Sequence, residues 1–426
     1  MPSENTTLSA LLAGALPFLR AEPHLIDPDY PRMIAAITAA GAGECWHKDS
    51  TFLGHLVGVH RILKLWGAAD SVARCGLLHS VYSNSYVDLI IFDPANGGRD
   101  LLRSIAGDEA EKLVHLFCVV PRQGLVHDDL LFRYSEEELA EHLEESAASI
   151  RRAREGGLRD ESERWRVKMA SVVPCEGIKV KDINTGEVVA LSRRMVAAFL
   201  LLTMADFSDQ LYAFQDELFD NNDGKMDFSG NTLTALWPGD GRPGLWMNSL
   251  SRMGALHTLI LREEELYTQA QKAIFAAGAQ LPDHQPANRD EWLQLVSPPV
   301  FKSCTKLLGR EEQREARDLY WQSMTAPANK DMAAAEKLLK KCSEKNGYVA
   351  EPHLVLGQVY MAQGRFEEAE EEAEQGLRLL LEWGTPWDKR MSWEGWVSWG
   401  RLILQKAKER SWPKSSFGII GLGLIR

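Results

Sequence analysis

Apolar residues recur at helical spacing along most of this chain, and this pattern constrains the fold more than any other feature. Between residues 51 and 66, the side chains of Phe52, Leu56, Val59 and Leu63 fall on one face of a helix. Similar stretches occupy residues 70–80, 108–119, 192–218, 246–271 and much of 301–410. The sequence therefore predicts a mainly α fold.

Two stretches depart from this pattern. Residues 176–191 alternate apolar and polar side chains around Asn184-Thr185-Gly186, which predicts a small β-hairpin. Residues 135–169 are highly charged, and we expect them to form an exposed helix broken at Gly156-Gly157. The hairpin is the one clear strand signal in the sequence.

The composition narrows the class of protein. The chain has 426 residues and a formal net charge of −12, with 48 Lys and Arg against 60 Asp and Glu. This acidity disfavours nucleic acid and anionic membranes as partners. The six cysteines form no C-x-x-C pair, which is typical of a reduced intracellular protein. No apolar run is long enough for a membrane span and the N-terminus lacks a basic leader region, so we expect a cytoplasmic protein.

Two helical stretches and a distant downstream segment each carry a histidine or an aspartate. His55 lies on one predicted helix, His79 ends the next, and Asp206 lies far downstream. Ligands on separate helices can converge on one point of a bundle. The stretches that carry these residues are TFLGHLVGVHRILKLWGAADSVARCGLLHS and LLTMADFSDQLYAF.

These stretches resemble the metal-binding motifs of the HD superfamily, and the resemblance spans about residues 47–215. It implies an HD-like helical bundle and a hydrolase that acts on a phosphate ester or nucleotide through a metal-bound water. The implied metal ligands are His55, His79 and Asp206, which would hold a divalent Mn, Fe, Mg or Zn ion. The expected contacts to a small phosphorylated substrate are His47, Lys48, Arg61, Tyr82 and Arg122.

One position departs from the superfamily pattern. Ser80 stands where the paired Asp of the His-Asp motif is expected, and an uncharacterised family in bacteria and plants shares this His-Ser form. A serine hydroxyl is a weaker ligand than a carboxylate, so Ser80 is a possible further ligand only. Asp88, Asp93 or Asp209 could replace the missing carboxylate; otherwise the metal has fewer protein ligands, or the site binds none.

Other functions within the same resemblance stay open. A similarity to alarmone hydrolases is weakened by Ser83 and Asn84, which replace the acidic pair that activates water there. A di-iron oxygenase would need His115 or His127 as a further ligand. A catalytically inactive scaffold is the third alternative, in which His55 and His79 are packed core residues.

The C-terminal part contains a repeat-like segment. The stretch HLVLGQVYMAQGRFEEAEEEAEQGLRL resembles a tetratricopeptide repeat, with Gly357, Ala369 and Ala373 at its small positions. This resemblance implies a helical region that binds a protein partner. The tryptophans from Trp387 to Trp399 are expected in its core. The predicted domains are an HD-like domain at 1–275, a linker at 276–312 and a repeat-like region at 313–426.

Overall fold

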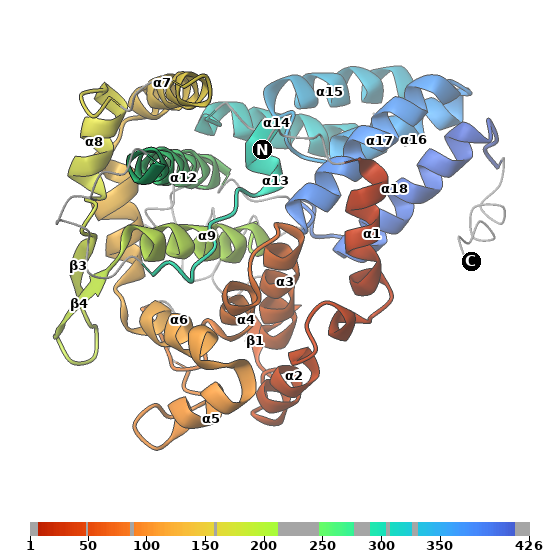
Figure 1. The fold of residues 1–426 in the computed structure, drawn as a ribbon. Coiled ribbons are helices and arrows are strands. Elements are labelled where there is room, and N and C mark those ends of the chain that lie inside the picture. Colours follow the sequence, from red (N-terminus) through yellow and green to blue (C-terminus); the bar gives the residue numbers. More distant parts are fainter. Residues whose placement is uncertain are drawn as a thin grey trace. The chain divides into compact units, whose positions relative to one another are not determined.

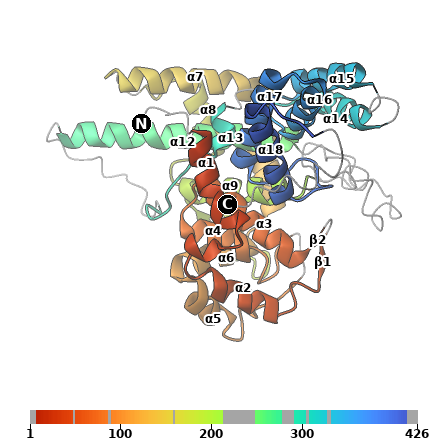
Figure 2. The ribbon, with the colours of Figure 1, turned by 90° about the vertical axis from the view of Figure 1, so that its right-hand side faces the viewer.

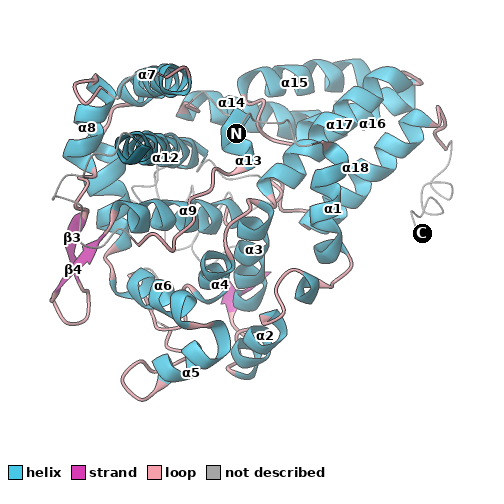
Figure 3. Ribbon diagram, viewed as in Figure 1, coloured by secondary structure: helices cyan, strands magenta, loops and turns pink. Residues whose placement is uncertain are grey.

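The computed structural model describes residues 7–47, 50–85, 89–156, 160–211, 247–276, 290–303, 307–325 and 331–413. This part of the chain is mainly helical, which confirms the predicted fold class, and it includes two short antiparallel hairpins (Figures 1 and 3). None of the described helices has both the length and the apolar character that a bilayer crossing requires.

The chain forms two compact units that are interleaved along the sequence. The first, here called the site unit, comprises Asp27–Phe207 and Ser249–Leu307. The second, here called the repeat unit, comprises Met1–Ile26, Ser208–Asn248 and Leu308–Arg426. The sequence predicted three consecutive segments, at residues 1–275, 276–312 and 313–426. That division into domains stays a prediction.

The site unit is a helical assembly with short β elements. Its elements are α2 (Tyr30–Ala39), β1 (Trp46–His47), β2 (Ser50–Thr51), α3 (Phe52–Leu65), α4 (Asp70–Leu78), α5 (Gly98–Ala106), α6 (Asp108–Val119), the π-helical turn η2 (Gly124–Leu130), the 3₁₀ turn η3 (Leu131–Arg133), α7 (Glu136–Arg154), α8 (Arg164–Val172), β3 (Ile178–Lys181), β4 (Val188–Leu191), α9 (Arg193–Asp209), most of α12 (Met247–Ala276) and α13 (Pro299–Ser303).

Helices α3 and α4 form a closely packed pair. The Thr51 side chain caps α3 by accepting a hydrogen bond from the Gly54 backbone N–H. Gly76 permits the close approach of α4, since a Cβ there would lie 2.3 Å from Leu63 Cδ1. The α3–α4 pair carries both histidines of the predicted site.

The predicted hairpin is confirmed. Strands β3 and β4 pair antiparallel, with Ile178 opposite Leu191 and Lys181 opposite Val188. Gly177 adopts φ +89°, and a Cβ at this position would lie 2.0 Å from the Leu191 carbonyl oxygen. The second hairpin, β1–β2, was not predicted.

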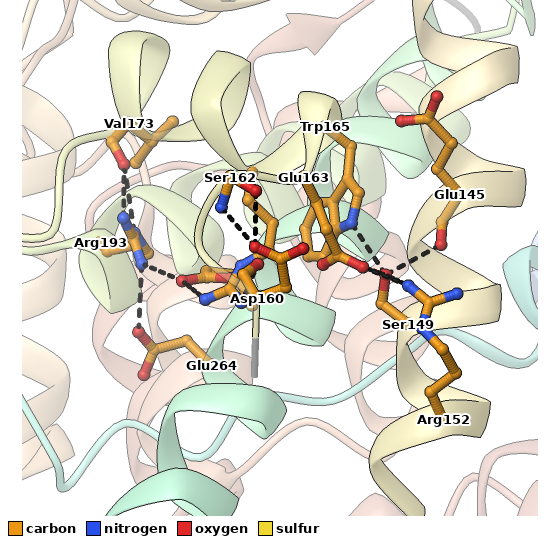
Figure 4. Close-up of polar contacts among 12 residues, drawn as sticks. Glu145, Ser149, Arg152, Asp160, Ser162, Glu163, Trp165, Val173, Arg193 and Glu264 are labelled. Carbon is orange, nitrogen blue, oxygen red and sulfur yellow. Dashed lines mark hydrogen bonds and ion pairs between the residues drawn. The ribbon is translucent and has the colours of Figure 1, made fainter. Parts of the chain in front are cut away.

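The charged segment forms two helices that pack through polar contacts. Helix α7 ends at Arg154, close to the predicted break, and α8 follows. The Ser149 hydroxyl accepts a hydrogen bond from the Trp165 indole at 3.0 Å and lies beside Glu163 (Figure 4). The long helices α7 and α12 run side by side (Figure 2), with Arg154 of α7 3.0 Å from Glu265 of α12.

A buried ion pair connects α8 to α12. Arg166 bonds both carboxylate oxygens of Glu263, at 2.8 and 3.1 Å, and both side chains are buried. Arg193, at the start of α9, donates to the Val173 carbonyl (Figure 4). Its Nη1 atom also lies 3.8 Å from Glu263. Because a two-bonded guanidinium–carboxylate pair has a fixed geometry, it orients these helices around α9.

The repeat unit is built from helical hairpins. Its described helices are α1 (Leu8–Leu19), α14 (Arg310–Met324), α15 (Met332–Lys345), α16 (Glu351–Gln363), α17 (Phe366–Trp383) and α18 (Trp393–Lys408). The small residues Ala369 and Ala373 are fully buried between α16 and α17, as predicted for a repeat hairpin. Trp387, Trp393 and Trp396 are also buried, which agrees with the expected core role, whereas Trp399 is only half-buried.

Candidate metal centre

Helices α3 and α9 and the end of α4 bring together His55, His79 and Asp206. The His55 Nε2 atom lies 3.3 Å from Asp206 Oδ1, and the His79 Nε2 atom lies 4.0 Å from the same oxygen. One ligand atom from each residue lies within 4.8 Å of the other two. Ligand atoms about 2.1 Å from a single tetrahedral ion are roughly 3.4 Å apart, so a small contraction of this group would suit one ion.

The three side chains are almost completely enclosed. His55 is 4%, His79 3% and Asp206 6% exposed. A buried carboxylate is stable only when hydrogen-bond donors or positive charges surround it. The enclosure therefore requires partners for Asp206, and the neighbouring side chains supply them.

The ring orientation of His79 is fixed by the backbone of α4. Its Nδ1 atom lies 2.7 Å from the Gly76 carbonyl oxygen, so the Nδ1–H group donates and the Nε2 lone pair is directed toward Asp206. Histidines that bind metals commonly donate their other ring N–H to a carbonyl in this way. His79 thus has the tautomer that a metal ligand needs.

The protonation states also suit a cation. Burial lowers the pKa of His79 to about 4; the Asp206 charge opposes this shift, whereas His55 and Arg122 add to it. Burial alone would raise the pKa of Asp206, but a hydrogen bond from His55 and the nearby His79 and Arg122 hold it well below its usual range. At neutral pH His79 is neutral and Asp206 is charged. A bound cation would replace the proton on His55 Nε2.

Arg122 lies on the other side of Asp206. Its Nη1 atom is 3.7 Å from Asp206 Oδ2, and its Cζ atom lies 3.8 Å from the centre of the Phe117 ring. Arg122 is only 1% exposed. The two carboxylate oxygens therefore face different groups: Oδ1 faces the histidines and Oδ2 faces the guanidinium. This geometry favours a single metal–oxygen bond through Oδ1.

Ser80 follows His79 and is buried, but it bonds a neutral group. Its hydroxyl oxygen accepts a hydrogen bond of 2.8 Å from the Asn84 amide, which also lies 3.4 Å from the His79 carbonyl oxygen.

Among the possible replacements for the missing carboxylate, Asp88 lies outside the described residues. Asp93 is exposed and bonded to Asn96.

Several other predicted ligands lie apart from the three-residue group. Within the described part of the chain, the group of possible metal ligands consists of His55, His79 and Asp206. Asp209, His115 and His127 do not belong to it. His115 lies near Tyr82, with ring centres 6.3 Å apart. His127 stacks on Phe207 in η2, with ring centres 6.0 Å apart.

The predicted substrate contacts are dispersed. The His47 ring lies 4.6 Å from the His55 ring, at the edge of the group. Lys48 lies outside the described residues. Arg61 is half-buried on α3 and lowers the pKa of Tyr30, against the larger effect of burial. Arg122 contacts Asp206 directly.

Tyr82 belongs to a separate buried cluster that sequence analysis missed. Its hydroxyl donates to Glu111 at 3.2 Å, and Arg99 and Arg103 bond the same carboxylate. The signal was present in the i, i+4 pair of arginines on α5. It was missed because the sequence pattern indicated no helix between residues 80 and 108, whereas α5 begins at Gly98.

Comparison with known proteins gives two partial matches. Residues 36–122 match a family described as a domain of unknown function (DUF6817). Residues 328–379 match the tetratricopeptide repeat. The first match includes His55 and His79 but ends before Asp206, and neither match is to an HD family. No curated protein and no solved structure matches the chain.

Proposed function

We propose that this protein is a metal-dependent hydrolase of phosphate esters, with its metal bound by His55, His79 and Asp206. The observation that carries the proposal is the convergence of two imidazole nitrogens and one carboxylate oxygen within 4.8 Å. Catalytic metal sites typically have three protein ligands and an open position, whereas structural zinc sites have four. Two imidazoles favour zinc or iron over magnesium.

The metal would supply a water activated for attack at neutral pH. The protein side chains would provide three further functions. The bond between His79 and the Gly76 carbonyl orients one ligand. Arg122 holds the second oxygen of Asp206 and excludes a second metal bond from it. His47, whose ring lies beside that of His55, would contact the substrate.

The charge of the group supports an anionic substrate. Arg122 compensates the charge of Asp206, and His79 is neutral at pH 7. A divalent cation would then leave a net charge of +2 in a buried site, which would attract a phosphate ester. Among the described residues no further carboxylate joins the group to replace the charge lost at Ser80, so one ion is expected here instead of two.

The test is hydrolysis by the full-length protein loaded with zinc, iron or manganese. The substrates are p-nitrophenyl phosphate, bis(p-nitrophenyl) phosphate and a nucleotide panel. We expect metal-dependent release that is lost in His55→Ala and retained in His115→Gln, because His115 lies outside the group. Turnover of none of these esters by the loaded protein, or activity that survives His55→Ala, would contradict the proposal.

A second function, protein binding, is supported by a groove on the repeat unit. The groove encloses about 460 Å³. Val355, Val359 and Ala362 line it from one face of α16, and Trp396 and Trp399 line it from α18. Met324, Met332 and Met391 also line it, and such flexible side chains adapt to varied partners.

Selection from a displayed random-peptide library tests this second function. We expect enrichment of apolar peptides whose binding is lost in Val359→Arg and kept in Lys337→Glu, an exposed residue outside the groove. A library that yields no enriched peptide, or peptides that ignore Val359→Arg, would exclude the groove as a binding site.

A further inference from the structure

Helix α1 has an unusual combination of composition and exposure. Its twelve residues, LSALLAGALPFL, include no charged side chain, and Ala15 is its one buried residue. A helix that is apolar on all sides is normally enclosed by protein. Here Leu12, Leu16 and Leu19 are only half-buried, although they lie on one face of the helix. Something apolar is therefore expected to cover this face.

The same leucines form one wall of a groove within the repeat unit. Helix α1 packs on α17, and the groove of about 650 Å³ runs between α1 and α18. Leu377 of α17 lies in its floor and is fully buried, and Leu404 lines it from α18. This groove is separate from the one lined by Val359.

The rim of the groove is basic. Arg20, Arg401 and Lys408 line it together with Glu409, whose carboxylate is bonded to Lys406 at 2.6 Å. Lys408 lies 3.8 Å from Glu370. Arg20 is exposed and Arg401 half-buried, and neither forms an ion pair with another residue of the described part of the chain. In a chain of net charge −12, two such arginines beside an apolar surface favour an acidic ligand.

We propose that this groove binds an amphipathic helix of a partner protein, with an apolar face on the leucines and acidic residues facing Arg20 and Arg401. An amphipathic helix that binds between α1 and α18 would bury its apolar face, and its own backbone groups would stay hydrogen-bonded to one another. A second copy of this chain fits less well. The exposed surface of its most acidic helix, α17, is almost entirely charged, and its leucines are buried.

The test uses the full-length protein and two synthetic, fluorescein-labelled helical peptides. Both have leucine at positions i, i+3, i+4 and i+7; one has glutamate at the flanking positions and the other has lysine. Fluorescence anisotropy should show the glutamate peptide binding about tenfold or more tightly than the lysine peptide. Hydrogen exchange should show protection in α1 and α18 on binding.

Arg401→Glu should weaken binding of the glutamate peptide by about tenfold or more, and the matched charge reversal Lys337→Glu should leave it unchanged. Equal binding of the two peptides, binding unaffected by Arg401→Glu, or no saturable binding would overturn the proposal. Light scattering that shows a dimer lost in Leu16→Gln would also overturn it, because a second copy would then occupy the groove.

Discussion

A carboxylate as enclosed as Asp206 needs compensation from several sides, and this requirement explains the residues around it. His55 and His79 face one oxygen, and Arg122 faces the other. Without a metal, the hydrogen bond from His55 and the nearby charge of Arg122 are among the interactions that compensate the carboxylate. Removing one member of a buried ion pair leaves an uncompensated charge and is strongly destabilising.

Arg122→Met should therefore lower the free energy of unfolding of the metal-free protein by about 3 kcal/mol, measured by urea denaturation in a chelator. Added zinc should restore part of this loss, because a cation would compensate Asp206 instead. Arg122→Lys, which keeps the charge, should lose less. The exposed control Arg133→Met should change the free energy by less than about 0.5 kcal/mol. A loss in the control equal to that in Arg122→Met would refute the assigned role.

His257 provides a test of pH dependence away from the metal group. It is 1% exposed, and burial lowers its pKa to about 4. Because the folded pKa is below the unfolded value, the unfolded chain binds more protons between pH 6.5 and 4. The stabilising effect of the neutral ring is complete above pH 6.5 and is lost as the pH falls toward 4.

His257→Leu should accordingly unfold with nearly the wild-type free energy at pH 7 and be more stable than wild type by about 2 kcal/mol near pH 4.5. The exposed control His24→Asn should follow the wild-type pH profile. If the free energies of unfolding of wild type and His257→Leu instead change in parallel with pH, burial does not disfavour the charged ring.

The resemblance to HD motifs named His55, His79 and Asp206, and these three side chains do lie together in the structure. Their surroundings were not predictable from the sequence. No residue pattern specified that Arg122 would turn inward onto Phe117, or that Asn84 would bond Ser80. Those contacts depend on how the α6–η2 connection and the loop after α4 pack, which local periodicity does not determine.

At the scale of elements, the α3–α4 pair sets the distance between the two histidines. Gly76→Val should force these helices apart, since a Cβ there would lie 2.3 Å from Leu63 Cδ1 and 3.1 Å from Val59 Cγ1. We expect a loss of about 2 kcal/mol in the free energy of unfolding and weaker zinc binding in calorimetry.

Gly14→Ala is the matched control for this substitution. Gly14 lies inside α1 with no atom within 4 Å of an added Cβ. Alanine should stabilise this helix by up to about 1 kcal/mol and leave zinc binding unchanged. Unchanged zinc binding in Gly76→Val would show that the helix spacing does not control the site.

Helices with a continuous apolar face were predictable, and elements built from turn residues were not. The helix at Asp108–Val119 and the hairpin at Ile178–Leu191 follow their sequence periods. Helix α5 begins within a Gly-Gly sequence, where glycine at φ +81° precedes the first turn. Strands β1 and β2 have two residues each, too few for an alternating pattern.

At the scale of the whole molecule, the interleaving of the two units makes a specific prediction. Helix α1 belongs to the repeat unit and packs on α17. Removing residues 1–26 should increase hydrogen exchange in α17 and α18 and leave exchange in α3 and α4 unchanged. Increased exchange confined to α3 and α4 would contradict this assignment. Sequence order alone suggested that the N-terminus belongs with the residues that follow it.

The central claim is that His55, His79 and Asp206 hold one metal ion, and elemental mass spectrometry of the purified, reconstituted full-length protein tests it most directly. We predict about one ion per chain in wild type and in His115→Ala, and almost none in His55→Ala or His79→Ala. Metal-free wild type after reconstitution, or undiminished metal in His79→Ala, would contradict the claim and leave the domain as a helical scaffold.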